Sequence, residues 1–254
     1  MDSILEIQGI SATFGGLHAL DGASFSVARG KTTGLIGPNG AGKTTLFNAI
    51  TGLLPQARGG VRFNGADIGG MRPEKISGQG LIRTFQLARG CPRMTVFEHL
   101  MLYGQRQPGE GFWAGLIGGA ISRAREQDLR EKAWAMARRL KLDHVLDNLV
   151  PALSGGQKKL LEIGRALLAE PTMILLDEPM AGVNPTLVGQ IAEQLEAVRA
   201  QGITVLIIEH DMALIRRLSD EVVVMAQGKY LTHGSFDQVT SDSRVQSSYL
   251  GRSR

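Results

Sequence analysis

The strongest signal in this sequence is a glycine-rich motif, Gly37-Pro38-Asn39-Gly40-Ala41-Gly42-Lys43-Thr44-Thr45. Its spacing is G-x-x-x-x-G-K-[ST], in which glycines turn backbone N–H groups toward phosphate oxygens, the lysine reaches the terminal phosphates and a hydroxyl meets magnesium. An apolar run at 34–36 precedes it, and a helical pattern that ends at Gly52 follows. The order strand, loop, helix predicts a polyphosphate cradle at the positive end of a helix. A glycine-rich turn without a ligand is the weaker alternative.

The bulk composition indicates a globular chain of 254 residues, either one large α/β domain or two small ones. The single cysteine, Cys91, excludes an internal disulfide framework and fits a reducing compartment. Neither a secretion signal nor a run long enough to span a bilayer is evident, so cytoplasm is the default expectation. The net charge of +4 is small for a nucleic-acid binder, and we expect no nucleic-acid partner.

The basic excess gathers in residues 123–141, a segment with two interpretations. We interpret it as a solvated helix face with ion pairs, and a patch for an acidic partner or for lipid headgroups is the other interpretation.

Apolar runs and helical periodicity alternate along the chain. Strands are predicted at 4–7, 23–27, 61–63 (with a hairpin turn at Asn64-Gly65), 81–85, 173–176, 203–208 and 222–225. Helices are predicted at 96–103, through the charged run to 140, from 158 onward, at 185–200 and at 212–218. We therefore expect a single domain over 1–254, with a catalytic core at about 1–88 and 165–235 and a helical lobe at about 89–164. The lobe carries an insertion at 105–125, and 236–254 form a C-terminal tail. We expect this tail to be loosely held from 241 onward, apart from the apolar Tyr249-Leu250.

Two acids, Asp177 and Glu178, end the buried-strand pattern at 173–176. Charge at such a position is costly unless it is compensated, and a magnesium nucleotide would compensate it. We expect Asp177 to hold the metal through water and Glu178 to act as general base toward the attacking water. A strand that simply reaches solvent at an acidic turn is the alternative.

A second glycine-containing helix start lies at Ser154-Gly155-Gly156-Gln157. As local structure, Ser154 and Gln157 form a capping box, S-x-x-Q. As chemistry, the stretch is a second anion site without a lysine. One chain cannot easily bring two such sites to the same phosphate, whereas two chains packed head to tail can.

Together with the phosphate loop and the Ile-Leu-Leu-Asp-Glu-Pro run at 174–179, the stretch Leu-Ser-Gly-Gly-Gln at 153–157 resembles the ATP-binding subunit of ABC transporters. The resemblance covers essentially the whole chain. It implies an α/β P-loop NTPase fold with a RecA-like core, an antiparallel β subdomain and an inserted helical subdomain, with ATP and Mg²⁺ as cofactors.

The resemblance also assigns roles. Phe14 matches an aromatic residue that stacks on adenine. Gln86 matches a glutamine that senses magnesium beside Thr44 and Asp177. His210 matches a histidine that contacts the γ-phosphate and positions Glu178. One position departs from the pattern, because Asn184 stands where many ABC ATPases have aspartate. Asn184 with Pro185 is also a good helix start, so a capping role suffices.

Several short sequence motifs are similar to motifs in the ATPases of branched-chain amino acid importers. They lie at 83–86, 94–100, 181–185, 209–212 and 249–251. The ATPases of urea and amide importers share these motifs. The resemblance implies a related second ATPase, two transmembrane permeases, an extracytoplasmic solute-binding protein and a place at the cytoplasmic face of the inner membrane. The apolar residues of 112–117 are hypothesised to touch a permease or headgroups, with a surface hairpin as the equal alternative. An ATPase of a lipopolysaccharide-type exporter is the closer rival, and a soluble ABC ATPase of DNA repair or translation is the remoter one.

Overall fold

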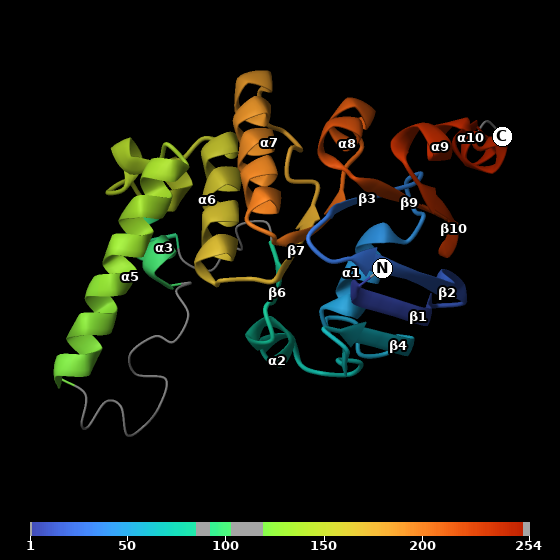
Figure 1. Ribbon diagram of the computed structural model, residues 1–254, viewed down its shortest axis with the longest axis horizontal. Helices are drawn as coiled ribbons and strands as arrows, with labels where there is room; N and C mark the ends of the chain where they lie inside the picture. The colour runs from blue at the N-terminus through green and yellow to red at the C-terminus, as the bar shows by residue number, and fades with distance from the viewer. Residues whose placement is uncertain (1, 85–91, 103–118, 251–254) are drawn as a thin grey trace. The chain divides into compact units, whose positions relative to one another are not determined.

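The computed structural model describes residues 2–84, 92–102 and 119–250 of the chain (Figure 1). The chain divides into two compact units. Unit 1 comprises Met1–Arg83, Thr172–Pro179 and Leu195–Arg254, and unit 2 comprises Thr84–Pro171 and Met180–Gln194. Gln86 and residues 105–118 of the expected insertion lie outside the described residues, as do the apolar residues of 112–117.

Unit 1 contains an antiparallel sheet of four strands in the order β2-β1-β4-β5. Its strands are β1 (Ser3–Phe14), β2 (Leu17–Ala28), β4 (Arg58–Phe63) and β5 (Ala66–Asp67). β4 and β5 pair with Phe63 opposite Ala66, which confirms the hairpin predicted from Asn64-Gly65. Leu5 and Ile7 of β1 are buried in the core of the unit, as the alternating pattern of that segment predicts.

A second sheet of unit 1 has the order β10-β9-β3-β8-β7-β6. Its strands are β3 (Thr32–Ile36), β6 (Leu81–Arg83), β7 (Met173–Asp177), β8 (Thr204–Ile208), β9 (Glu221–Ala226) and β10 (Lys229–Gly234). All neighbours are parallel except β10 and β9. Since parallel strands end at one edge, the segments that follow β3, β7 and β8 meet there, which is where ligands bind in open α/β sheets.

Helix α1 (Lys43–Ile50) follows β3 and the phosphate loop, and it buries Leu46, Phe47 and Ile50. Thr51 caps its C-terminus, and Gly52 comes next with φ 73°, a left-handed conformation that glycine adopts at little cost. The predicted end of the helix is confirmed. The other helices of unit 1 include α2 (Pro73–Gly78) and α8 (Met212–Leu218).

Unit 2 is helical in its described part. It contains α3 (Val96–Leu102), α5 (Gly119–Arg139), α6 (Gly155–Leu168) and the short 3₁₀ turns Asp143–Val145 and Val150–Ala152. α6 packs a buried face of Leu160, Leu161 and Ile163. The long α7 (Pro185–Ala200) belongs to unit 2 as far as Gln194 and to unit 1 beyond it.

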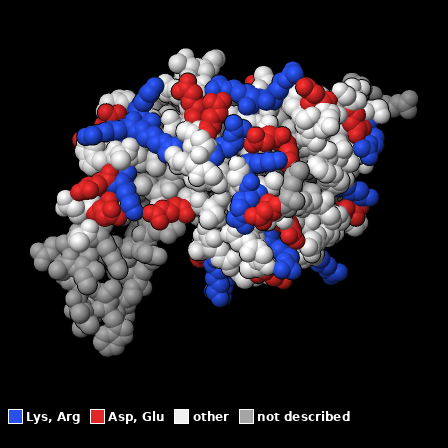
Figure 2. All heavy atoms as spheres, viewed as in Figure 1, with Lys and Arg blue, Asp and Glu red and all other residues white. Residues whose placement is uncertain are grey.

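The basic segment at 123–141 lies almost entirely in α5, and its charges are paired along the helix. Arg130 pairs with Glu126 at 2.9 Å and Lys132 with Asp128 at 3.2 Å, both four residues apart. Figure 2 shows basic and acidic side chains intermixed on the face that it draws. These pairs fit the solvated helix face that the sequence favours. Among the residues that the structure describes, no helix has the length and apolar character needed to cross a membrane.

The prediction that the chain is loosely held from 241 onward is wrong for the described residues 241–250. The described part of 236–254 forms two helices, α9 (Phe236–Ser241) and α10 (Ser243–Leu250). Ser235 and Gln238 make a reciprocal capping box at the start of α9, and Val239 and Val245 are buried. The burial of two valines and one capping box therefore stabilise helices in a segment whose overall composition is polar.

Candidate functional site

A cavity of about 200 Å³ in unit 1 joins the phosphate loop to two predicted catalytic side chains. Its lining is Asn39, Gly40, Ala41, Gly42, Lys43, Thr44, Thr45, Glu178 and His210. The segments that follow β3, β7 and β8 supply these residues. The sheet order thus brings together side chains that lie far apart in the sequence.

Two glycines of the loop are required by its backbone. Gly37 has φ 151°, and a Cβ there would collide with the carbonyl oxygen of Met225. Gly42 has φ 96°, and a Cβ there would meet the carbonyl oxygen of Ala19 at 2.5 Å. Side chains at either position would displace the loop, so the cradle depends on the glycines that the motif specifies.

Lys43 is 6% exposed, and its ammonium group lies among loop carbonyls. Nζ donates to the carbonyl oxygen of Gly37 at 2.8 Å and to that of Pro38 at 3.2 Å. Burial lowers the pKa of Lys43, and the charges of Glu178 and Asp177 oppose that shift. The N-terminus of α1 has no side-chain cap, because Gly42 occupies the cap position. A buried cation beside uncapped helix amides suits a polyphosphate.

Asp177, the predicted magnesium residue, is bound by an arginine that sequence reasoning missed. Arg83 at the end of β6 donates from one guanidinium nitrogen to Oδ2 of Asp177 at 2.8 Å and from the other to Oδ1 of Asn48 at 2.6 Å. The two side chains of the ion pair are 7% and 19% exposed. A basic residue at the end of a buried apolar strand was the available signal, since such a charge needs a partner.

Magnesium fits this donor set only together with phosphate. No cluster of three or more His, Cys, Asp or Glu side chains able to hold a metal occurs within residues 2–84, 92–102 and 119–250. Mg²⁺ commonly binds through one or two carboxylates and completes its shell with substrate phosphates and water. Asp177 and the hydroxyl of Thr44 match that pattern. The other predicted metal residue, Gln86, lies outside the described residues.

Glu178 and His210 contact each other directly. Nε2 of His210 lies 2.6 Å from Oε1 of Glu178, and both side chains remain partly exposed in the cavity. Glu178 holds φ 49°, an uncommon conformation for a non-glycine residue, and its N–H donates to the carbonyl oxygen of Ile208 at 3.0 Å. Asp211, the next residue after His210, caps α8 through Oδ1. Both ends of the contact are therefore anchored by backbone structure.

Phe14 lies at the end of β1 and is 44% exposed. It pairs across the hairpin with Leu17, which is 70% exposed. Phe14 is not among the described residues that line the cavity. The structure therefore leaves the ring accessible to solvent but does not place it in the cavity with the phosphate loop.

The second predicted anion site, residues 154–157, lies in unit 2 and caps itself. Ser154 Oγ accepts from the N–H of Gln157 at 3.3 Å, and Gln157 Oε1 accepts from the N–H of Ser154 at 2.9 Å. The predicted capping box is confirmed. So is the cap at α7, where Asn184 Oδ1 accepts from the N–H of Leu187 at 2.9 Å.

The C-terminal helix also reaches the phosphate loop. Burial raises the pKa of Tyr249, and a hydrogen bond from the backbone of Gly37 partly offsets that rise. Tyr249, one of the two apolar residues excepted from the loosely held tail, thus interacts with the backbone of the first glycine of the loop.

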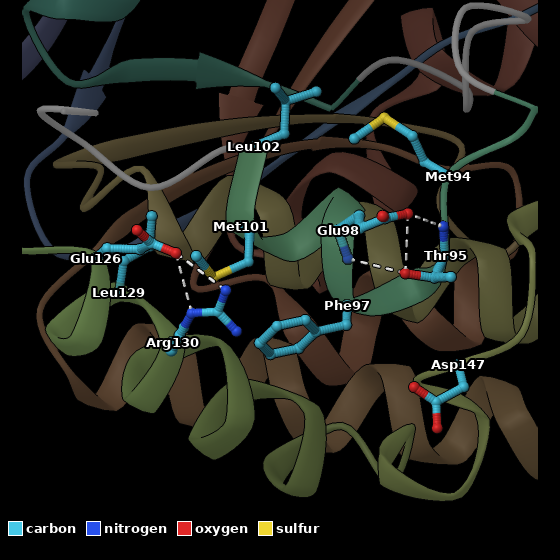
Figure 3. A pocket seen from close by; sticks show the side chains of 10 residues that line it. All are labelled: Met94, Thr95, Phe97, Glu98, Met101, Leu102, Glu126, Leu129, Arg130 and Asp147. Atoms are coloured by element: carbon cyan, nitrogen blue, oxygen red, sulfur yellow. Dashed lines mark hydrogen bonds and ion pairs between the residues drawn. The ribbon is translucent and has the colours of Figure 1, made fainter. Parts of the chain in front are cut away.

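A larger cavity, of about 710 Å³, lies in unit 2 between α3 and α5 (Figure 3). Phe97 and Arg130 face each other within it, with the guanidinium 5.9 Å from the ring centre, while Oε2 of Glu98 accepts from the N–H of Thr95 at 2.7 Å. Its apolar lining includes Met94, Met101 and Leu102. No glycine-rich phosphate loop lines this cavity, so we do not assign the reaction to it although it is larger than the cavity in unit 1.

Comparisons with known proteins agree with this geometry. Residues 20–181 match the family described as ABC transporter. A probable branched-chain amino acid transport ATP-binding protein LivG of Methanocaldococcus jannaschii is 40% identical, over 98% of this chain and 97% of its own. The high-affinity branched-chain amino acid transport ATP-binding protein BraF of Pseudomonas aeruginosa is 36% identical, over 98% of both chains. A crystal structure of an ABC transporter's ATP-binding cassette in its ADP conformation superposes with a TM-score of 0.84 at 40% identity, covering 99% of this chain and 100% of that one.

Proposed function

We infer that this chain, which belongs to the ABC transporter family as an ATP-binding subunit that hydrolyses ATP, energises an importer of branched-chain amino acids or a related small polar solute. Support for the solute class comes from the names of relatives that are 32–40% identical and match almost end to end. The ATPase subunit does not itself select the solute, so the solute class rests on this kinship.

The contact between His210 and Glu178 beside the phosphate loop carries the proposed mechanism. Lys43 and the first amides of α1 bind the β- and γ-phosphates of ATP. Glu178 accepts the proton of the attacking water, and His210 holds the carboxylate in place while it contacts the γ-phosphate. Magnesium, held by Asp177, Thr44 and Gln86, would neutralise charge on the phosphates. The ring of Phe14 would stack on adenine.

A second ATPase chain completes the site in this proposal. Residues 154–157 of one chain would face residues 37–45 of the other, and ATP would lie between them. Closure on ATP and reopening after hydrolysis would drive two permeases at the cytoplasmic face of the inner membrane, with a solute-binding protein outside. The partner ATPase is expected to be a related chain.

The test of the chemistry is Glu178→Gln. We expect hydrolysis to fall by about 100-fold or more while ATP binding is retained, because the amide cannot accept the proton from water. The variant should also accumulate as a closed dimer on ATP. Glu196→Gln is the matched control, since it removes a carboxylate that pairs with Arg217 at 2.8 Å in the same unit. Hydrolysis by Glu178→Gln at the wild-type rate would reject Glu178 as the base.

The solute is tested separately by uptake of radiolabelled amino acids in a strain lacking this chain. Restored uptake of leucine, isoleucine or valine supports the proposal. Uptake that is the same with and without the chain for every amino acid tested would contradict it.

A further inference from the structure

Arg83 is a buried cation that the proposed hydrolytic mechanism does not use. Its side chain is 7% exposed and pairs with Oδ2 of Asp177, the carboxylate proposed to hold magnesium. Burial lowers the pKa of Arg83, and the charge of Asp177 and its hydrogen bond oppose that shift. An arginine side chain is not deprotonated in proteins. The metal carboxylate is therefore already neutralised by a resident positive charge.

Three further contacts fix that charge in position. The second guanidinium nitrogen donates to Asn48 on α1, and the guanidinium lies over the ring of Phe47, 5.5 Å from its centre. The backbone of Arg83 is held in β6, which is in register with β7. The planar guanidinium thus binds two acceptors and a ring at once, a combination that lysine does not reproduce. Arg83 is part of the scaffold between α1 and the strand that carries Asp177.

We propose that Arg83 is a resident counter-cation of Asp177 and makes magnesium binding conditional on the nucleotide. A carboxylate that is already paired attracts a dication less strongly, and bound Mg²⁺ would lie close to the guanidinium, which repels it. The described residues offer no cluster of three acids that could outweigh this repulsion. Phosphate oxygens supply the missing negative charge, so the metal enters with ATP rather than before it. The inference rests on the proposed role of Asp177 in magnesium binding and deepens it.

The pair also explains how the cradle tolerates Asp177 without ligand. A half-buried carboxylate with no partner destabilises the fold, whereas one paired with a fixed guanidinium does not need a metal. Without Arg83 the carboxylate would lose its direct ion-pair partner and keep only the more distant charge of Lys43, so it would attract a free divalent cation more strongly. Arg83 is thus a positioning residue, since it acts on the metal through Asp177.

The experiment measures metal binding without and with nucleotide on the full chain. Mn²⁺ stands in for Mg²⁺, and free Mn²⁺ is followed by electron paramagnetic resonance for wild type, Arg83→Gln, Arg83→Lys and Arg217→Gln. The last variant removes an arginine–carboxylate pair, with Glu196, away from the cradle. ATP affinity in the presence of EDTA is measured in parallel, because it reports the phosphate cradle independently of the metal.

We expect wild type and Arg217→Gln to bind Mn²⁺ only with ATP present. Arg83→Gln should bind Mn²⁺ without nucleotide at least about tenfold more tightly than wild type, because a fixed unit charge beside the carboxylate is gone. Arg83→Lys keeps the charge but loses the second hydrogen bond and the ring contact, so its Mn²⁺ affinity without nucleotide should lie between those of wild type and Arg83→Gln. Asp177→Asn combined with Arg83→Gln should abolish the gain.

Two results would overturn the inference. One is equal Mn²⁺ affinity of Arg83→Gln and wild type without nucleotide, with ATP binding in EDTA intact. The other needs no variant and stands even if Arg83→Gln fails to fold: wild type that binds Mn²⁺ as tightly without ATP as with it. Amino acid uptake that is the same with and without the chain, while Mn²⁺ binding changes among the variants as expected, would count against the proposed function alone.

Discussion

The N-termini of α1 and α6 begin with glycine-rich sequences and differ in how their amides are satisfied. α1 starts after Gly42, which has no side chain to cap the helix, and its first residue is the buried Lys43. α6 starts after Ser154, whose hydroxyl accepts from Gln157 while Gln157 accepts in return. The first backbone amides of α1 therefore have no side-chain cap, whereas α6 is capped by its own side chains.

The difference assigns the two ends unequal tasks. Uncapped amides beside a desolvated ammonium are stabilised by an anion, so α1 can bind phosphate without help. At α6 the capping box already satisfies two donors, and an anion finds only the remaining amides and the proton of the Ser154 hydroxyl. The α6 end is therefore suited to adding to a phosphate that is already held elsewhere. A single chain is expected to bind ATP yet hydrolyse it poorly.

The largest expected effect is a difference in ATP affinity between two alanine variants, one for the lysine in the first turn of each helix. Lys43→Ala should weaken ATP binding by at least about 100-fold, because it removes a buried charge that pairs with phosphate. Lys158 on the first turn of α6 also donates to a carbonyl, that of Pro151 at 3.2 Å. Lys158→Ala should change ATP affinity by less than about twofold, since no phosphate is held there by one chain. Titration with a fluorescent ATP analogue measures both, and equal losses would erase the distinction.

The next largest effect is expected in the free energy of unfolding when one glycine at the start of each helix is replaced by alanine. Gly42→Ala puts a Cβ at φ 96° against the carbonyl oxygen of Ala19, and we expect a loss of about 2 kcal/mol in the free energy of unfolding together with weaker ATP binding. Gly155→Ala is the matched change on α6, where the added Cβ lies 3.7 Å from the carbonyl oxygen of Gly182, an ordinary contact. It should leave the free energy of unfolding unchanged or slightly higher. Urea denaturation compares them, and a comparable loss in Gly155→Ala would contradict the interpretation.

In both units, the elements that are predictable from sequence are those with local signals. The order strand, loop, helix at residues 34–50 follows from the glycines and apolar periodicity, and the predicted helices at 185–200 and 212–218 match α7 and α8 at both ends. The cap residues Ser154 and Asn184 were readable for the same reason, since a cap and its partner lie three residues apart.

Contacts between distant segments were less predictable. The pairing of Arg83 with Asp177 joins residues 94 positions apart and depends on β6 lying next to β7, which no local pattern specifies. The formation of α9 and α10 depends on the burial of Val239 and Val245, each of which is a single apolar residue in a polar stretch of sequence. The capping box at Ser235 is a local signal for α9 that the polar composition of the tail does not reveal.

The smallest expected effect uses the two capping boxes at Ser154 and Ser235 to separate structure from chemistry. Ser154→Ala and Ser235→Ala each remove an N-cap hydroxyl from an S-x-x-Q box, and each should cost about 1 kcal/mol of unfolding free energy. ATP affinity of the single chain should be unchanged in both, because α1 holds the phosphate. Only Ser154→Ala should lower ATP hydrolysis by the assembled transporter, by roughly tenfold, since only that hydroxyl is proposed to reach the partner's phosphate. If both variants hydrolyse ATP equally well, Ser154 is a cap and nothing more, and the closed end of α6 takes no part in binding phosphate.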